Sequence, residues 1–171
     1  MNLGEILADA ARHHPDRDAI VWHHGTERRT YREVDDRAAA LAAGLVEELK
    51  VQPGDRVAVM MSNSPELLET LFAVWKAGAT ISPLNARLTR EEIQYQVTDC
   101  EAKVFIVGSE FTETALGLRD ELDVEAFVLE SPAAAAEDLG GSPASPDGHN
   151  VVGLGDLRDR HAGETPPDPG T

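Results

Sequence analysis

The sequence predicts an α/β fold: a mainly parallel sheet flanked by helices, opened by an amino-terminal hairpin. From residue 56 onward, short apolar runs of strand length alternate with helical periodicity, as in parallel sheets covered by helices. Before them, residues 19–29 hold two strand-like runs around Gly25, which is typical of a hairpin. With 42% hydrophobic residues, the 171-residue chain can bury a core of ordinary domain size.

The first elements are a helix and the hairpin. Asn2 is predicted to cap a helix that has Glu5 at its third position and stops at Pro15. The hairpin strands are predicted over residues 19–22 and 27–29.

The central elements begin with a capping box, in which Thr30 and Glu33 satisfy each other's backbone N–H groups at the start of a long helix. A Pro-Gly-Asp turn follows, and then a buried strand over residues 56–61. Ser64 is predicted to cap the next helix, with Pro65 at the first helical position, where its missing N–H has no cost.

The later elements continue the alternation. Gly78 is predicted to end the preceding helix in a left-handed conformation, and a second capping box, Thr89 with Glu92, opens another helix. The predicted ranges are strand 80–82, helix 90–98, strand 103–107, helix 112–122 and strand 126–129.

Beyond Glu130 the composition changes to Pro, Gly, Ala, Ser and Asp, which predicts a domain over residues 1–130 and a flexible acidic tail over residues 131–171. Within the tail, residues 153–158 (GLGDLR) have some similarity to glycine-rich phosphate-binding turns. They lack the third glycine, follow no convincing strand and carry Asp156 where a phosphate would approach. A flexible turn is the preferred interpretation.

The charge of the chain is strongly acidic. Fifteen Lys and Arg stand against 31 Asp and Glu, giving a formal net charge of -16. Such a surface repels nucleic acid and anionic lipid, so neither is expected as a partner. Adaptation to high salt is the favoured interpretation, because salt screens the self-repulsion of the chain; an ordinary acidic protein is the alternative.

The single cysteine, Cys100, excludes an internal disulfide and a cysteine-based metal cluster. The adjacent pairs His13-His14 and His23-His24 are interpreted as surface residues, because neighbouring histidines diverge and seldom bind one ion. No signal peptide and no apolar stretch of about 20 residues is present, so we expect a cytoplasmic protein without a membrane span.

Three segments carry a resemblance to a known family. They are residues 30–34 (TYREV), residues 53–59 (PGDRVAV) with 63–66 (NSPE), and residues 75–79 (WKAGA) through 83–89 (PLNARLT). In this order they resemble the opening of acyl-CoA synthetases, the acid–CoA ligase branch of the adenylate-forming, AMP-binding enzymes. Asn85 favours acids activated for CoA over amino acids.

The resemblance implies a reaction for a full-length relative. A carboxylic acid and ATP, with magnesium, would give an acyl-adenylate and pyrophosphate, and CoA would then displace AMP. Fatty or other aliphatic acids would be the substrates. The family's phosphate loop, rich in Ser, Thr and Gly, and its catalytic lysine have no counterpart in this sequence.

We therefore expect an amino-terminal portion of such a ligase, inactive alone and without a cofactor of its own. Its partner would be the remainder of the ligase or a second copy in a homodimer. The alternative is a non-catalytic binding or assembly module that pairs with a partner chain supplying the phosphate loop.

Candidate ligand contacts are few. Asn63 and Ser64 lie at a strand-to-helix junction, where parallel sheets place their sites, and Arg87 lies in a following loop. Each also has a structural interpretation, since Ser64 is a helix cap and Arg87 can pair with a surface acid. No catalytic and no metal-binding residue is predicted.

Overall fold

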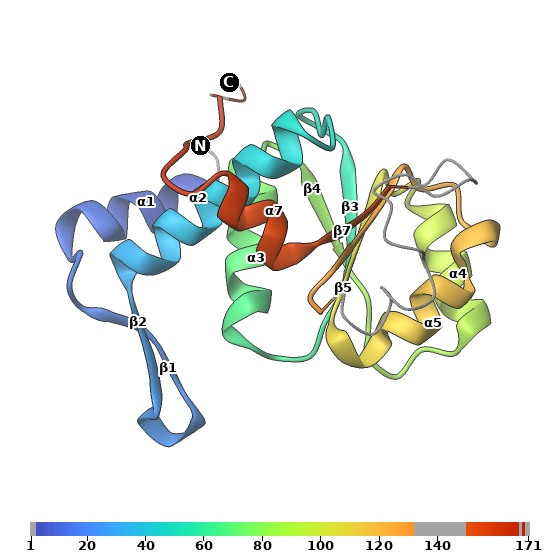
Figure 1. Cartoon of the computed structure of the whole chain (residues 1–171), viewed down its shortest axis with the longest axis horizontal. Helices are drawn as coiled ribbons and strands as arrows, with labels where there is room; N and C mark the ends of the chain where they lie inside the picture. Colours follow the sequence, from blue (N-terminus) through green and yellow to red (C-terminus); the bar gives the residue numbers. More distant parts are fainter. Residues whose placement is uncertain (1–2, 132–149, 168, 170–171) are drawn as a thin grey trace. The chain divides into compact units, whose positions relative to one another are not determined.

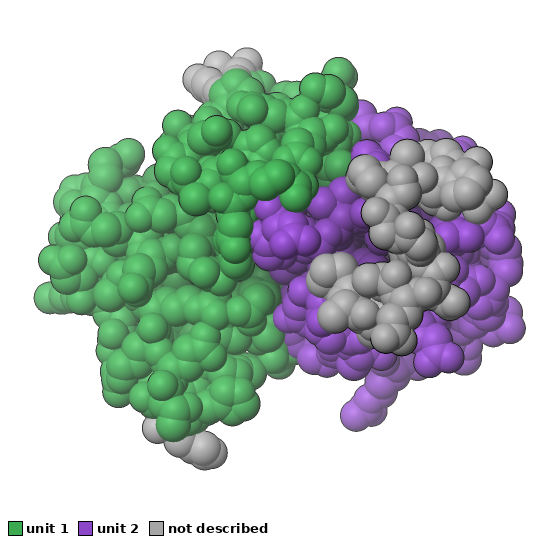
Figure 2. Space-filling model, viewed as in Figure 1, with its two compact units in different colours: residues 1–53, 63–79, 158–171 green, residues 54–62, 80–157 purple. Residues whose placement is uncertain are grey.

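The computed structural model describes residues 3–131, 150–167 and 169, and it confirms the predicted fold class (Figure 1). The chain forms two compact units (Figure 2). Unit 1 comprises residues 1–53, 63–79 and 158–171, and unit 2 comprises residues 54–62 and 80–157. Each unit is thus built from segments that are distant in sequence.

Unit 2 contains a five-stranded sheet in the order β4-β3-β5-β6-β7, in which every neighbouring pair is parallel. All residues of β5 and β6 are buried, which explains their uninterrupted apolar sequences. The strands are β3 (Arg56–Met60), β4 (Thr80–Pro83), β5 (Val104–Val107), β6 (Ala126–Leu129) and β7 (Asn150–Gly153).

The helices of unit 2 are α4 (Arg90–Asp99) and α5 (Thr112–Gly117), with 3-10 turns η2 (Ser109–Phe111) and η3 (Arg119–Glu121). Their apolar residues share one buried cluster with alternate residues of the sheet, including Phe105 and Phe127. The predicted helix over residues 112–122 is too long. The guanidinium of Arg90 donates to the carbonyl of Gly117 at 2.6 Å, and the chain continues as η3 instead of α-helix.

In the described part of the chain, unit 1 contains three complete helices, the last residues of α7 (Leu154–Arg160) and the predicted hairpin, whose strands pair antiparallel. Its elements are α1 (Gly4–His13), β1 (Asp18–Trp22), η1 (His23–Gly25), β2 (Glu27–Thr30), α2 (Tyr31–Glu47) and α3 (Pro65–Lys76). Leu7, Ile20 and Val34 bring the first helix, the hairpin and α2 into one buried cluster, against which Leu68 and Phe72 of α3 pack.

Three predicted helix starts are confirmed. Thr30 and Thr89 each form both halves of a capping box, and Ser64 accepts a hydrogen bond from the backbone of Leu67 at 3.0 Å. Gly78 has φ +75°, the left-handed conformation predicted for the end of α3. These features depend on residues a few positions apart, which is why sequence alone located them.

The start of α1 differs from the prediction. Asn2, the predicted cap, lies outside the described residues; the helix begins at Gly4, after Leu3, and Glu5 is its second residue instead of its third. A Cβ added to Gly4 would lie 2.9 Å from the backbone nitrogen of Lys76. The first residue of α1 therefore packs closely against the end of α3. Leu3, at the N-cap position, makes no side-chain capping hydrogen bond.

The predicted flexible tail is wrong for residues 150–160, which form β7 and the helix α7 (Leu154–Arg160). Residues 153–158, interpreted as a flexible turn, are the end of that strand and most of that helix. Val151 pairs in register with Phe127 of β6, and Leu154 and Leu157 are buried. The partner strand ends at Leu129, so local composition could not reveal the pairing. Among the described residues, no helix is long and apolar enough to cross a membrane.

Candidate functional site

The sheet of unit 2 has one point at which its strand order reverses. From β3 the chain moves outward to β4 and then crosses back to β5 on the other side of β3. Ligands of open parallel sheets bind at the carboxyl ends of the strands at such a reversal. The edge formed by the residues after β3 and β5 is therefore the expected ligand position in this unit.

The chain's own carboxylates occupy backbone donors at this edge. Glu110 accepts a hydrogen bond from the backbone N–H of Ser62 at 3.1 Å. Glu130 accepts from the backbone N–H of Ser109 at 2.9 Å and from its hydroxyl at 2.8 Å. Backbone N–H groups like these would be the donors for a phosphate, and here they bind carboxylates instead.

The electrostatics of Glu110 agree with this arrangement. Partial burial alone would raise the pKa of Glu110, but the hydrogen bonds from Ser62 outweigh it and the pKa lies below its ordinary value. The backbone approaches closely here, since a Cβ added to Gly108 would lie 3.2 Å from the Cα of Met61. This edge therefore carries fixed negative charge.

The predicted contact residues fall in different units. Asn63 is exposed before α3 in unit 1, and the hydroxyl of Ser64 is used as the cap of that helix. Arg87 is exposed in unit 2, where its backbone N–H donates to the side-chain oxygen of Asn85 at 2.9 Å. Neither unit by itself brings all three together, and their contact with a ligand stays a prediction.

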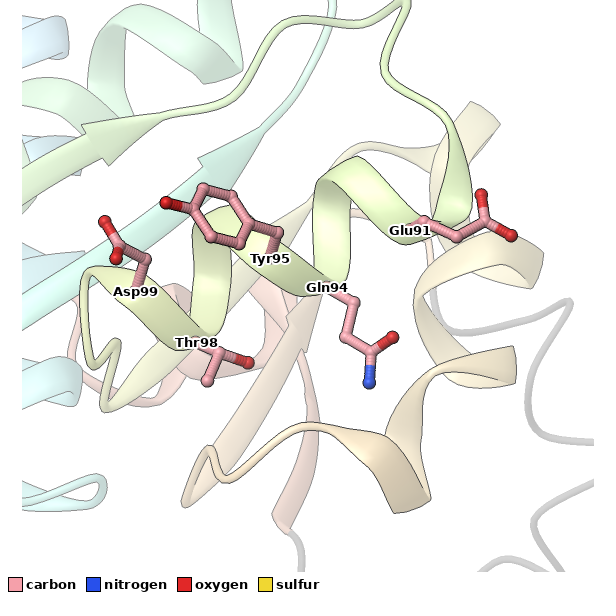
Figure 3. Close-up of a pocket in the computed structure, with 5 residues that line it drawn as sticks. All are labelled: Glu91, Gln94, Tyr95, Thr98 and Asp99. Carbon is pink, nitrogen blue, oxygen red and sulfur yellow. The ribbon is translucent and has the colours of Figure 1, made fainter.

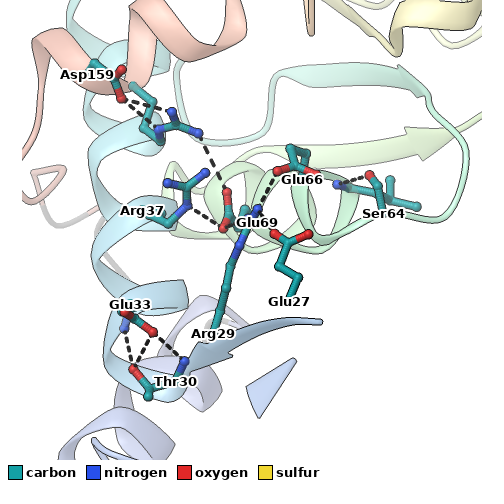
Figure 4. A network of polar contacts seen from close by, with 11 residues as sticks. Glu27, Arg29, Thr30, Glu33, Arg37, Ser64, Glu66, Glu69 and Asp159 are labelled. Atoms are coloured by element: carbon teal, nitrogen blue, oxygen red, sulfur yellow. Dashed lines mark hydrogen bonds and ion pairs between the residues drawn. The ribbon is translucent and has the colours of Figure 1, made fainter. Parts of the chain in front are cut away.

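A buried acid lies at the centre of a polar network in unit 1 (Figure 4). Glu69 of α3 is 3% exposed and accepts hydrogen bonds from Arg29 of β2 and, at 2.6 Å, from Arg37 of α2. Arg158, at the end of α7, is 3.9 Å away. Arg29 also donates to Glu66 and Glu27, at 2.6 Å each.

This network fixes charge and is unsuited to proton transfer. Burial would lower the pKa of Arg29, but its hydrogen bonds to Glu66 and Glu69 raise it above the ordinary value. A permanently charged guanidinium that is held by three carboxylates cannot exchange a proton near neutral pH. The network was missed in the sequence because Glu69 stands within an ordinary helical pattern and its two hydrogen-bond partners, Arg37 and Arg29, lie 32 and 40 residues away.

A hollow on α4 is a weak candidate (Figure 3). Its lining is Glu91, Gln94, Tyr95, Thr98 and Asp99, all from this one helix, and Tyr95 is 67% exposed. Small-molecule sites are concave and enclose most of their ligand. Among the described residues, the lining side chains come from this single helix and no second element faces them, so we assign the hollow no ligand.

Comparison with known proteins decides the family. The family described as AMP-binding enzyme matches residues 7–169, nearly the whole chain. The chain belongs to the AMP-binding enzyme family. The resemblance of the three sequence segments is thereby confirmed.

Individual AMP-binding relatives are acid–CoA ligases by name. The chain is 42% identical over 116 residues to a feruloyl-CoA synthase from Amycolatopsis sp, covering 68% of this chain and 23% of that protein. It is 37% identical over 110 residues to a long-chain-fatty-acid–CoA ligase from Haemophilus influenzae, covering 64% and 19%. A solved structure from Rhodopseudomonas palustris, provisionally named a long-chain-fatty-acid CoA ligase, matches with TM-score 0.75 and 28% identity, covering 97% and 37%.

These matches cover only a small part of each curated relative. The chain spans about a fifth of the length of the two curated relatives, 23% and 19% respectively. It matches a portion of an AMP-binding ligase.

Proposed function

We propose that this chain is the amino-terminal portion of an ATP-dependent, AMP-forming carboxylic acid–CoA ligase. The observation that carries the proposal is the AMP-binding match over residues 7–169, together with the identity to two acid–CoA ligases. The complete enzyme would join a carboxylic acid to AMP with release of pyrophosphate and transfer the acyl group to CoA. ATP, Mg²⁺ and CoA would be its cofactors and substrates.

Within such an enzyme this chain would supply scaffold and little of the chemistry. Charge stabilisation at the phosphates supplies much of the acceleration in reactions of this kind. Here the backbone donors of Ser62 and Ser109, at the reversal of the strand order, already bind Glu110 and Glu130. We therefore infer that the chain alone is inactive, and that the remainder of the ligase, or a partner chain, supplies the phosphate loop and lysine.

The substrate class has two candidates. We propose a fatty acid, in line with the name of the Haemophilus relative. An aromatic acid is the second candidate, because the feruloyl-CoA synthase shares the higher identity, 42% against 37%.

The first experiment is to sequence the DNA that follows the codon of Thr171 in all three frames. We expect a reading frame that encodes a loop rich in Ser, Thr and Gly and ending in Lys-Gly. The continuous protein, given Mg-ATP, CoA and palmitate or ferulate, should release pyrophosphate and form a thioester, whereas the 171-residue chain should do neither. Catalysis by the short chain alone would contradict the inferred inactivity.

The same assay tests the proposed contacts. Arg87→Ala in the continuous protein should raise KM for ATP or the acid and leave the melting temperature unchanged, because Arg87 is exposed. An unchanged KM would remove Arg87 from the site. An unrelated downstream sequence would instead favour the assembly-module alternative, which purification of the chain with a partner that restores pyrophosphate release would then test.

A further inference from the structure

The carboxyl-terminal end of α2 carries a cluster of ionisable groups that the ligase function does not use. His161, just after α7, is 8% exposed and lies among Glu47, Glu48 and Glu164, all within unit 1. The composition of this segment predicted a flexible tail, and no local pattern marks this histidine. It is the buried member of a group whose carboxylates come from two distant segments.

The distances give the two ring nitrogens different surroundings. Nδ1 is 2.6 Å from an oxygen of Glu164 and 3.9 Å from an oxygen of Glu47. Nε2 is 2.9 Å from Glu48. Glu48 is in turn held by Arg160, whose Nε and Nη2 each donate at 2.8 Å, one to each carboxylate oxygen.

This arrangement is the one that orients a metal-binding histidine. Such a histidine donates one ring N–H to a fixed carboxylate or carbonyl, so that the lone pair of the other nitrogen faces the ion. Here Nε2–H would donate to Glu48, which Arg160 immobilises. Nδ1 then faces Glu47 and Glu164, and one ligand atom from each of these three residues lies within 4.8 Å of the others.

We propose that Glu47, His161 and Glu164 bind a divalent transition-metal ion with the preferences of zinc, while Glu48 orients the imidazole. One nitrogen and two carboxylate ligands suit Zn²⁺, and water would complete a tetrahedral site. The proposal is independent of the ligase function.

The observed geometry reaches that of a zinc site by rotation of the two glutamate side chains. With bonds of about 2.0–2.2 Å, ligand atoms of a tetrahedral zinc site stand roughly 3.3–3.5 Å apart. The contact of Nδ1 with Glu164 would lengthen by about 0.8 Å and that with Glu47 would shorten by about 0.5 Å. The ligand oxygens of Glu47 and Glu164, which lie within 4.8 Å of each other, would approach by up to about 1.4 Å. Both glutamates are exposed, so side-chain rotation can supply these shifts.

The electrostatics of the helix end favour a cation. The last turn of α2 contains Glu47 and no basic residue, and a helix carries partial negative charge at its carboxyl end. One cationic group already lies at this helix end, since the ammonium of Lys50 donates to the backbone carbonyl of Glu47 at 2.5 Å. A proton is the competitor of the metal, because the hydrogen bond to Glu164 raises the pKa of His161, although burial opposes it.

The test is calorimetric titration of the 171-residue chain with ZnCl₂ at about pH 8, where the proton competes least. We expect one zinc site per chain. Glu48→Gln should weaken binding by about 10-fold to 100-fold, the usual effect of losing such an orienting partner, and His161→Gln by more. Mg²⁺ should not displace the zinc, because it prefers octahedral oxygen ligands.

Two variants make the test specific. His13→Gln removes an exposed histidine that also neighbours a carboxylate, Asp9 at 3.6 Å, and should leave zinc binding unchanged. Glu47→Gln alters an exposed side chain 3.9 Å from the ring, so it should fold normally and still weaken binding about 10-fold. The proposal is overturned if wild type binds no zinc, or if Glu47→Gln and His161→Gln bind it as tightly as His13→Gln.

Discussion

At the scale of single residues, Glu69 shows how burial changes the importance of an ion pair. Its carboxylate is 3% exposed and bonded to two guanidinium groups, whereas Glu101, which pairs with Arg56, has a side chain that is 79% exposed. Removing one partner of a buried pair leaves the other charge without compensation, while exposed pairs are screened by water.

We predict that Glu69→Gln lowers the free energy of unfolding by about 3 kcal/mol, because Arg37 loses its ionic partner and Arg29 retains only Glu27 and Glu66. Urea denaturation measures the change. The matched control, Glu101→Gln, should cost less than about 1 kcal/mol. Equal effects of the two substitutions would contradict the structural role assigned to the network.

At the scale of elements, the capping box of α2 makes the stability of this helix depend on pH. The backbone N–H of Thr30 donates to Glu33 at 2.7 Å, and the hydroxyl donates at 3.0 Å. These bonds, the backbone one foremost, hold the pKa of Glu33 below its ordinary value of 4.5. Because the pKa of Glu33 is lowered, the ionised carboxylate stabilises the helix at every pH above the ordinary pKa of 4.5. This stabilisation is lost as the pH falls through the lowered pKa of the folded chain.

Thr30→Ala should lower the stability of the chain by about 1 kcal/mol at neutral pH, the usual cost of losing a helix cap. It should also move the pKa of Glu33 part of the way back toward 4.5, because the backbone hydrogen bond remains. Carbon-13 NMR titration of the Glu33 carboxylate reads the shift directly. Thr26→Ala is the control: its hydroxyl bonds only locally, to the carbonyl of His23, and Glu33 should titrate as in wild type.

The same distinction between local and distant partners explains which elements could be predicted. The caps at Thr30, Ser64 and Thr89 depend on a residue three positions away, and all three were predicted correctly. The strand β7 depends on pairing with β6, which ends 21 residues earlier, so its two valines looked like part of a tail. The surroundings of His161 arise from Glu48, 113 residues away, and no local pattern signals that contact.

At the scale of the whole molecule, the net charge of -16 opposes compactness. If the chain is adapted to high salt, its thermal stability should increase with the NaCl concentration. Raising NaCl from about 0.1 M to about 1 M shortens the screening length from about 10 Å to about 3 Å. The midpoint of thermal unfolding should rise by several degrees, since about 1 kcal/mol corresponds to roughly 2–4 °C at this chain length.

The control for this experiment removes charge instead of screening it. Asp36→Asn, Asp99→Asn and Asp123→Asn together alter three exposed acids, and should raise the midpoint at low salt and reduce its response to NaCl. A midpoint that is insensitive to salt in wild type would leave an ordinary acidic protein as the better description.

The interleaving of the two units along the chain also governs how the protein can be made. Unit 1 needs residues 158–171, and unit 2 needs residues 54–62 as well as 80–157. A ribosome that adds about 5–20 residues per second delivers the first 53 residues roughly 5–20 s before the segment that completes their unit. During that interval the alanine-rich helix α2 has only part of its unit to pack against. The nascent chain is therefore a potential client for chaperones that bind apolar segments, and slow translation would prolong its exposure.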